Sequence, residues 1–283
     1  MISKKPYISV IIPTYNRARF IIKAIDSVLN QKNCQWPFEI IIVDDGSTDN
    51  TESILKPYKN KIRYFKIPHS GLPAVARNYG IKKARGELIA FQDSDDLWVP
   101  NKLASQIPVF DDRSVILSYG NAELSTNTDK RSKQTVIPQG SGKSGFIFKE
   151  LIDTNFISTL TVMARKDSIV DAGGFNESPS LRGVEDYELW LRLSAHGQFI
   201  FVDKPLALHR RHAENISHTI DYQNNEHILS VYREILKTNV TKEQKSLVRH
   251  AIHHLLNSRQ NRLSGIKYIT NKVQIFTNKA RLN

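Results

Sequence analysis

The sequence contains a single cysteine, Cys34, among 283 residues. One thiol excludes an intramolecular disulfide and a metal site built from thiolates, and it favours a reducing, cytoplasmic location. Long hydrophobic runs are also missing, because no apolar stretch approaches the roughly 20 residues that a membrane-spanning helix needs. The apolar run from Ile8 to Ile12 is too short for a signal peptide. These absences predict a soluble or peripheral protein.

Two common phosphate-binding motifs are absent. The first predicted strand is not followed by G-x-G-x-x-G, and G-x-x-x-x-G-K-[ST] occurs nowhere in the chain. Without these glycine-rich loops, neither a Rossmann dinucleotide site nor a P-loop is supported. Any phosphate group must therefore be bound by residues of another kind.

Acidic residues are absent from the last forty positions, Gln244 to Asn283, although the whole chain has a net charge of +12. An excess of positive charge attracts an anionic partner such as nucleic acid, an anionic membrane surface or a polyphosphate ligand. This basic tail could rest on an anionic membrane, or it could be a solvated helical face packed by its apolar stripe. Its basic side chains are Lys245, Arg249, Arg259, Arg262, Lys267, Lys272, Lys279 and Arg281.

The composition that is present, with 40% hydrophobic and 24% charged residues, is typical of a globular protein. At this length the chain can bury a full core. Apolar periodicity predicts alternating strands and helices over residues 7–96, with a parallel, doubly wound α/β sheet. Small residues, Ala76 and Gly80, predict a closely packed helix. The predicted strands cover residues 7–12, 38–43, 62–67 and 88–91, and the predicted helices 20–29, 52–55 and 74–84.

The second half has a weaker pattern. Residues 121–145 are rich in Ser, Thr, Asn, Lys and Gly, which predicts an irregular excursion. A strand over residues 161–164, a turn at 173–175 and a helix over 184–196 follow. From about Tyr222 the apolar stripes are helical again.

Two acidic clusters follow predicted strands: Asp44 and Asp45 follow the second, and residues 93–96 follow the fourth. Open α/β sheets bind ligands at the carboxyl ends of their strands. Asp93 and Asp95 could hold Mg²⁺ or Mn²⁺, which prefer oxygen ligands and would neutralise a departing nucleotide. Asp45 could accept hydrogen bonds from a base or ribose. Each cluster by itself could equally be a solvated turn that caps the next helix.

Two further constellations occur later in the chain. Glu185 and Asp186 lie in the first turn of a predicted helix. There they could complement the helix dipole, or Asp186 could act as a general base. His209 and His212 flank two arginines and could complete a metal shell, meet phosphate charge or lie on a solvated surface.

Taken in order, these motifs resemble the inverting family-two glycosyltransferases of the GT-A fold, over roughly residues 7–217. The similarity is carried by SVIIPTYN at 9–16, VDDGSTD at 43–49, ARNYG at 76–80 and DSDD at 93–96. Later matches are GGF at 173–175, the pair Glu185–Asp186, and Arg211–His212 with Ser217, where the family's late element is shifted or doubled.

The resemblance implies a Rossmann-like, mostly parallel GT-A sheet flanked by helices. It implies transfer of a sugar, with inversion, from a nucleotide-diphosphate donor, most often a uridine one, to a hydroxyl of a saccharide, lipid-linked or protein acceptor. A divalent metal, Mn²⁺ or Mg²⁺, would be needed, and no nucleic acid partner is expected. Surface polysaccharide or glycolipid synthesis is the implied setting. Residues 1–105 would form the donor-binding half, 106–220 the acceptor-binding and catalytic half, and 221–283 a basic helical extension.

The resemblance also assigns roles to individual residues. Asp186 would be the base, and Asp93, Asp95 and His212 would bind the metal. The remaining residues of the nucleotide site would be Pro13, Thr14, Tyr15, Asp45 and Arg77, together with Asp93. Additional candidates are Asn16, Asp44, Asp96, Glu185, His209 and Arg211.

Two other functions are consistent with parts of the sequence. A nucleotidyltransferase would carry a glycine-rich basic loop after its first strand, and residues 13–19 do not form one. A non-enzymatic basic protein that binds nucleic acid or membranes would leave the acidic clusters at successive strand ends unexplained.

Overall fold

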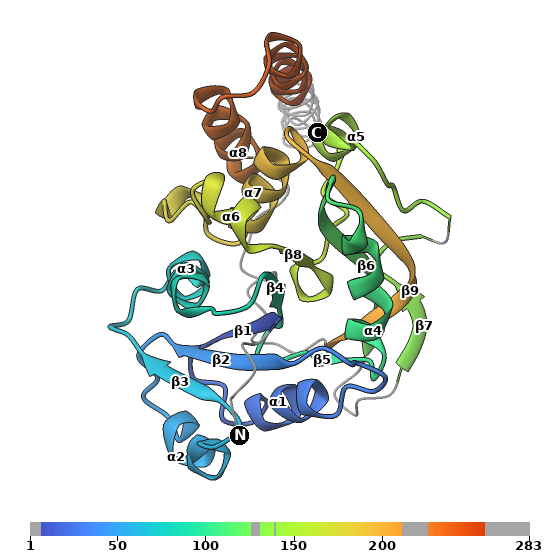
Figure 1. Ribbon diagram of the computed structural model, residues 1–283. Coiled ribbons are helices and arrows are strands. Elements are labelled where there is room, and N and C mark those ends of the chain that lie inside the picture. The colour runs from blue at the N-terminus through green and yellow to red at the C-terminus, as the bar shows by residue number, and fades with distance from the viewer. Residues whose placement is uncertain (1–6, 126–130, 139, 211–225, 258–283) are drawn as a thin grey trace, which may run out of the picture.

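The computed structural model describes residues 7–125, 131–138, 140–210 and 226–257. These residues form a nine-stranded sheet flanked by helices (Figure 1). The strands are β1 (Ile8–Thr14), β2 (Phe38–Asp44), β3 (Arg63–Lys66), β4 (Leu88–Phe91), β5 (Leu97–Trp98), β6 (Val115–Ser125), β7 (Arg131–Thr135), β8 (Met163–Arg165) and β9 (Gln198–Arg210). The α-helices are α1 (Ile21–Leu29), α2 (Thr51–Leu55), α3 (Pro73–Lys83), α4 (Lys102–Gln106), α5 (Phe148–Asp153), α6 (Lys166–Asp171), α7 (Glu185–Ser194) and α8 (Glu226–Lys237). Residues 242–257 form a further helix, and the 3₁₀ turns are η1 (Lys56–Tyr58), η2 (Ile107–Asp111), η3 (Thr159–Thr161) and η4 (Pro179–Leu181).

The first half of the sheet is parallel, as the alternating pattern predicted. Strands β3, β2, β1 and β4 lie side by side in that order. In β1, Ile8, Val10 and Ile12 pack in one hydrophobic cluster with α1, whereas Ile11 packs in the other cluster with α3. Figure 1 shows α1 and α2 on one side of these strands and α3 on the other. Because both faces are covered, β1 carries apolar residues on both faces rather than alternating apolar and polar ones.

Helix α3 packs closely on β1. A Cβ atom added to Gly80 would lie 2.6 Å from Cγ2 of Ile11, so a larger residue would push the helix away. Ala76, one turn earlier, is buried as well. The close packing predicted from these two small residues is confirmed. It brings Arg77 and Asn78, on the same helix, close to the rest of the core.

Beyond β4 the sheet becomes mixed. Strand β8 is antiparallel to β4 and β6, β9 is parallel to β6, and β5 is antiparallel to β9. The predicted irregular excursion over 121–145 is wrong in part, because β6 continues to Ser125 and β7 pairs with it. Strand β9, which pairs along β6 from Gln198 to Arg210, was not predicted from the sequence. Backbone pairing between these strands orders a polar sequence that shows little periodicity by itself.

The predicted C-terminal helices are confirmed as far as residue 257. Helix α8 lies against α7, and the Tyr232 hydroxyl donates a 2.5 Å hydrogen bond to the carbonyl oxygen of Ile152. The following helix, 242–257, places Val248 in the same hydrophobic cluster. Within the described part of the chain, no helix is long and apolar enough to cross a membrane.

Candidate active site

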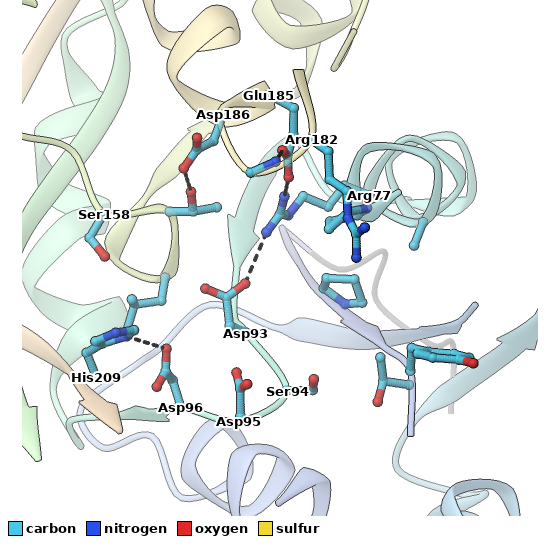
Figure 2. Close-up of a pocket in the computed structure, with 18 of the residues that line it drawn as sticks. Arg77, Asp93, Ser94, Asp95, Asp96, Ser158, Arg182, Glu185, Asp186 and His209 are labelled. Carbon is cyan, nitrogen blue, oxygen red and sulfur yellow. Dashed lines mark hydrogen bonds and ion pairs between the residues drawn. The ribbon is translucent and has the colours of Figure 1, made fainter. Parts of the chain in front are cut away.

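A pocket of about 760 Å³ lies at the carboxyl ends of β1, β2 and β4. The chain runs outward from β1 to β3 and then returns to β4 on the other side of β1. Such a reversal of strand order opens a crevice at the carboxyl ends of the strands, where α/β sheets bind ligands. Residues 155–160 and the start of α7 complete the walls (Figure 2).

The β1 and β2 ends form one wall of the pocket, which Pro13 and Thr14 also line. The Tyr15 ring, 38% exposed, stacks on His69 with 4.1 Å between ring centroids. Asp45 fixes the segment that carries His69, because its carboxylate accepts the Ser70 and Gly71 N–H groups at 2.8 and 2.9 Å.

The hydroxyl oxygen of Thr14 is buried in this wall and has no hydrogen-bond partner in the described structure. Burying a polar atom without a partner costs about 1–3 kcal/mol. A polar group of a bound ligand would remove that cost. Together with the exposed Tyr15 ring, this wall suits a flat, polar group such as a nucleoside.

Asn16 and Asp44 do not line the pocket. The Asn16 side-chain oxygen accepts the Thr48 N–H at 2.8 Å, which ties the loop after β1 to the loop after β2. Asp44 is fully buried and accepts hydrogen bonds from the Ser47 N–H (2.7 Å) and the Tyr64 hydroxyl (2.6 Å). Both residues therefore stabilise the loops around the pocket without lining it.

Arg77 lines the pocket and connects three segments. Its Nη1 donates to Glu185 at 2.7 Å and its Nη2 to Asp93 at 3.2 Å. The side chains of Arg77 and Glu185 are 9% and 6% exposed. Removing one member of such a buried pair typically costs about 3–5 kcal/mol, because the other charge is left buried alone. Arg77 thus fixes the end of β4 against the start of α7.

The acidic segment after β4 divides into two parts. Asp93 and Asp95 line the pocket, and Arg17 Nε donates to Asp95 at 3.3 Å. Asp96 also lines the pocket, but it lies 3.1 Å from His209 Nδ1 and accepts the Arg210 N–H at 2.7 Å. Burial raises the pKa of Asp96 to about 6, and the hydrogen bond to Asp96 raises the pKa of His209. Contacts from β9 therefore stabilise the acidic turn at residues 93–96.

The described residues could hold a divalent cation only if a bound ligand supplied further coordinating oxygens. Burial raises the pKa of Asp93, and the Asp95 carboxylate adds to that rise, so a nearby cation would be favourable. However, no three His, Cys, Asp or Glu side chains in the described ranges are grouped so as to hold a metal ion. The oxygen donors of Asp93 and Asp95 would need to be supplemented, as by a diphosphate. Arg211 and His212 lie outside the described residues.

Asp186 lies across the pocket from the acidic turn, in the first turn of α7 (Figure 2). Its Oδ2 accepts a short hydrogen bond from the Thr159 hydroxyl, and its Oδ1 accepts the Tyr187 N–H at 2.7 Å. Burial raises the pKa of Asp186 to about 6, and the Glu185 carboxylate contributes to the rise. A carboxylate with this pKa is ionised at neutral pH and is a better base than an ordinary aspartate.

Six polar residues of the pocket were not predicted from the sequence. Asn155, Ser158, Thr159 and Arg182 lie in the second half of the chain, where the pattern is weak, and Arg17 and His69 lie in loops. A signal existed for His69, which lies two residues before Gly71. The others are identified only by their place in the folded pocket.

The mostly parallel α/β sheet, with its pocket at the reversal of strand order, belongs to the GT-A type of fold. Residues 9–169 match the model of glycosyl transferase family 2. The chain belongs to this family, whose members are inverting glycosyltransferases.

Several curated relatives are similar in sequence. TuaG of Bacillus subtilis, a glycosyltransferase named for teichuronic acid biosynthesis, is 30% identical over 89% of this chain and 97% of its own length. The UDP-Glc:alpha-D-GlcNAc-diphosphoundecaprenol beta-1,3-glucosyltransferase WfgD of Escherichia coli is 34% identical over 66% of this chain and 69% of its own length. An uncharacterized glycosyltransferase of Rickettsia bellii is 36% identical over 74% of this chain, which spans only 29% of that longer protein.

Solved structures share the fold. Residues 1–349 of Staphylococcus aureus TarS, in complex with UDP-GlcNAc, match with a TM-score of 0.66 and 21% identity, over 87% of this chain and 71% of that one. The mannosyltransferase PcManGT of Pyrobaculum calidifontis, in complex with GDP-Man and Mn²⁺, matches with a TM-score of 0.64 and 17% identity, over 88% and 69%. These likenesses confirm the GT-A architecture.

Proposed function

We propose that this protein transfers a sugar from a uridine-diphosphate donor to a hydroxyl of a saccharide or lipid-linked acceptor, with inversion, in the synthesis of a surface polysaccharide. The observation that carries the proposal is the arrangement of Asp186 across one pocket from Asp93 and Asp95. A base and a diphosphate-binding turn must face each other in this way for a hydroxyl to attack a nucleotide sugar. The names of WfgD and of the TarS complex support uridine as the nucleotide.

In this proposal the nucleoside contacts the wall formed by Thr14, Tyr15 and Asp45. Asp186 accepts the proton of the acceptor hydroxyl, and the hydroxyl oxygen then forms a bond to the anomeric carbon from the face opposite the nucleotide. The bond between that carbon and the diphosphate oxygen breaks, so the configuration at the carbon inverts. Thr159 and the Tyr187 N–H hold the Asp186 carboxylate in place for this step.

Asp93 and Asp95 would hold a divalent cation, Mn²⁺ or Mg²⁺, that offsets the charge of the leaving diphosphate. The same proposal divides the domain into a donor half, residues 1–105, and an acceptor half, residues 106–220. Asp93 and Asp95 come from the donor half, and Asp186 comes from the acceptor half. The single cysteine supports a cytoplasmic location.

The experiment compares the protein with an Asp186→Asn variant. Nucleotide-sugar binding is measured by calorimetry with Mn²⁺, and transfer is measured as UDP release with saccharide and lipid-linked acceptors. Asp186→Asn keeps the donor affinity because the side chain retains its shape, while transfer falls by about 10²–10⁴-fold because the base is lost. A chelator removes transfer, and Asp95→Ala weakens donor binding only when Mn²⁺ is present.

A matched control is Asp167→Asn, which makes the same change in the first turn of another helix, at an exposed position outside the pocket. This variant should behave like the unmodified protein. Near-normal turnover by Asp186→Asn would show that Asp186 is not the base.

A further inference from the structure

One cation that lines the pocket, Arg182, has no carboxylate partner among the described residues. The other arginines and histidines of the lining each contact a carboxylate. Within the described residues, no hydrogen bond or ion pair involves the exposed Arg182 guanidinium. The neutralised groups are paired as Arg17–Asp95 (3.3 Å), His69–Asp45 (3.1 Å), Arg77–Glu185 (2.7 Å) and His209–Asp96 (3.1 Å).

The backbone of Arg182 is held firmly although its side chain is exposed. The preceding residue, Leu181, is fully buried, and its carbonyl oxygen accepts the Val184 N–H at 2.9 Å. The following residue, Gly183, has a φ of 81°, which favours glycine, and donates its N–H to Glu185 at 2.5 Å. A cation on a fixed backbone loses less conformational entropy when it binds a ligand than one on a mobile loop.

The position of Arg182 associates it with the acceptor. It precedes the base Asp186 by four residues on the segment that leads into α7. Figure 2 shows Arg182, Glu185 and Asp186 on one side of the pocket and the turn of Asp95 and Asp96 on the opposite side. The donor diphosphate belongs to the side of that turn, whereas the group that reaches Asp186 is the acceptor hydroxyl.

We propose that Arg182 binds an anionic group of the acceptor, so that the protein selects acceptors that carry a phosphate or carboxylate near the attacking hydroxyl. A guanidinium offers two parallel N–H donors that match either oxyanion. This inference rests on the proposed function, because it takes Asp186 to mark the acceptor side.

The test uses protein saturated with UDP and Mn²⁺ and three probes of each sugar series: the methyl hexoside, the hexose 1-phosphate and the hexuronic acid. Calorimetry measures the affinity of each probe in the glucose, galactose and N-acetylglucosamine series. In the N-acetylglucosamine series only the methyl glycoside and the 1-phosphate are used. We expect the anionic probes to bind about tenfold to a hundredfold more tightly than the neutral one, which is the typical effect of a charge-assisted hydrogen bond. The phosphate and carboxylate arms show which anion is preferred.

The variant Arg182→Gln should remove this preference, and Arg182→Lys should retain part of it. The affinity for UDP should stay the same in both. A matched control, Arg113→Gln, removes an equally exposed arginine that does not line the pocket and should change nothing.

Equal binding of neutral and anionic probes by the unmodified protein would overturn the inference. So would a loss of UDP affinity in Arg182→Gln with the acceptor preference intact, which would assign the residue to the donor diphosphate. Both results are independent of whether Asp186→Asn abolishes transfer, so a failure of this inference is distinguishable from a failure of the proposed function.

Discussion

At the scale of single residues, the environment of Asp186 determines how it can act as a base. The carboxylate is affected by the charges of Glu185 and Arg77 and by the hydrogen bonds from Thr159 and the Tyr187 N–H. Burial and Glu185 favour the protonated form, whereas Arg77 and the hydrogen bonds favour the ionised form. The balance leaves the pKa at about 6, above the 3.8 of an ordinary aspartate.

This balance predicts the pH dependence of transfer. A base acts only when deprotonated, so kcat/KM should fall as the pH decreases through about 6. Thr159→Val removes a hydrogen bond to the ionised form, and the acid limb should therefore move upward by about one to two pH units. Thr159→Ser keeps the hydroxyl and should leave the limb in place. A limb that does not move in Thr159→Val, measured over pH 5–9, would contradict this role for Thr159.

At the scale of secondary-structure elements, α3 joins the donor and acceptor sides. Besides the ion pairs of Arg77, the Asn78 amide donates to the Phe175 carbonyl oxygen and accepts the Phe175 N–H, both at 2.8 Å. The glycines before Phe175 have φ values of 88° and 75°, which other residues rarely adopt. The turn at 173–175 is thus held against the same helix that holds the start of α7.

We predict that Asn78→Ala destabilises the protein by about 1–3 kcal/mol, because two backbone groups of Phe175 lose their partner. Denaturant unfolding followed by circular dichroism measures the change. Lys82→Ala, on an exposed position of the same helix, is the control and should alter stability by less than about 0.5 kcal/mol. Equal stability of the two variants would show that the turn does not depend on Asn78.

At the scale of the whole molecule, the excess of positive charge is divided between the packed domain and the end of the chain. Helix 242–257 contributes Val248 to the hydrophobic core, so its apolar stripe is occupied within the protein. Residues 258–283 contain six basic and no acidic residues, about half of the net charge of +12. A truncation that tests attraction to an anionic membrane should therefore be made after residue 257 rather than earlier in the chain.

A truncation after Asn257 should bind anionic vesicles more weakly than the full chain. Each basic residue near such a surface contributes about 1 kcal/mol, and the effect weakens with salt. Flotation with phosphatidylserine vesicles, at low and physiological salt, measures the difference, with neutral phosphatidylcholine vesicles as the control. Equal flotation of the two proteins would show that residues 258–283 do not contribute to membrane binding. Both proteins should unfold at the same temperature, because the core is retained.

The sequence by itself determined the parallel half of the fold and predicted the acidic residues that line the pocket. Strands β1, β2 and β4, helix α3 and the two acidic turns follow from local apolar periodicity and from turn residues, which act over a few positions. Asp186 was found because it belongs to a short, ordered motif. These features need no knowledge of distant contacts.

Only the tertiary structure decided which of these residues meet. Arg77 pairs with Glu185 across 108 positions. His209 reaches Asp96 across 113 positions, because Leu208 of β9 pairs with Leu97 of β5. Strand β9 was not predicted, because the polar residues Asp203 and Lys204 interrupt its apolar residues. The end of β6 was predicted to be irregular, because a polar strand is stabilised by pairing with distant backbone rather than by its own pattern. That Arg182 has no carboxylate partner within the described ranges is likewise a property of the assembled pocket, because carboxylates of the lining already pair with the other cations.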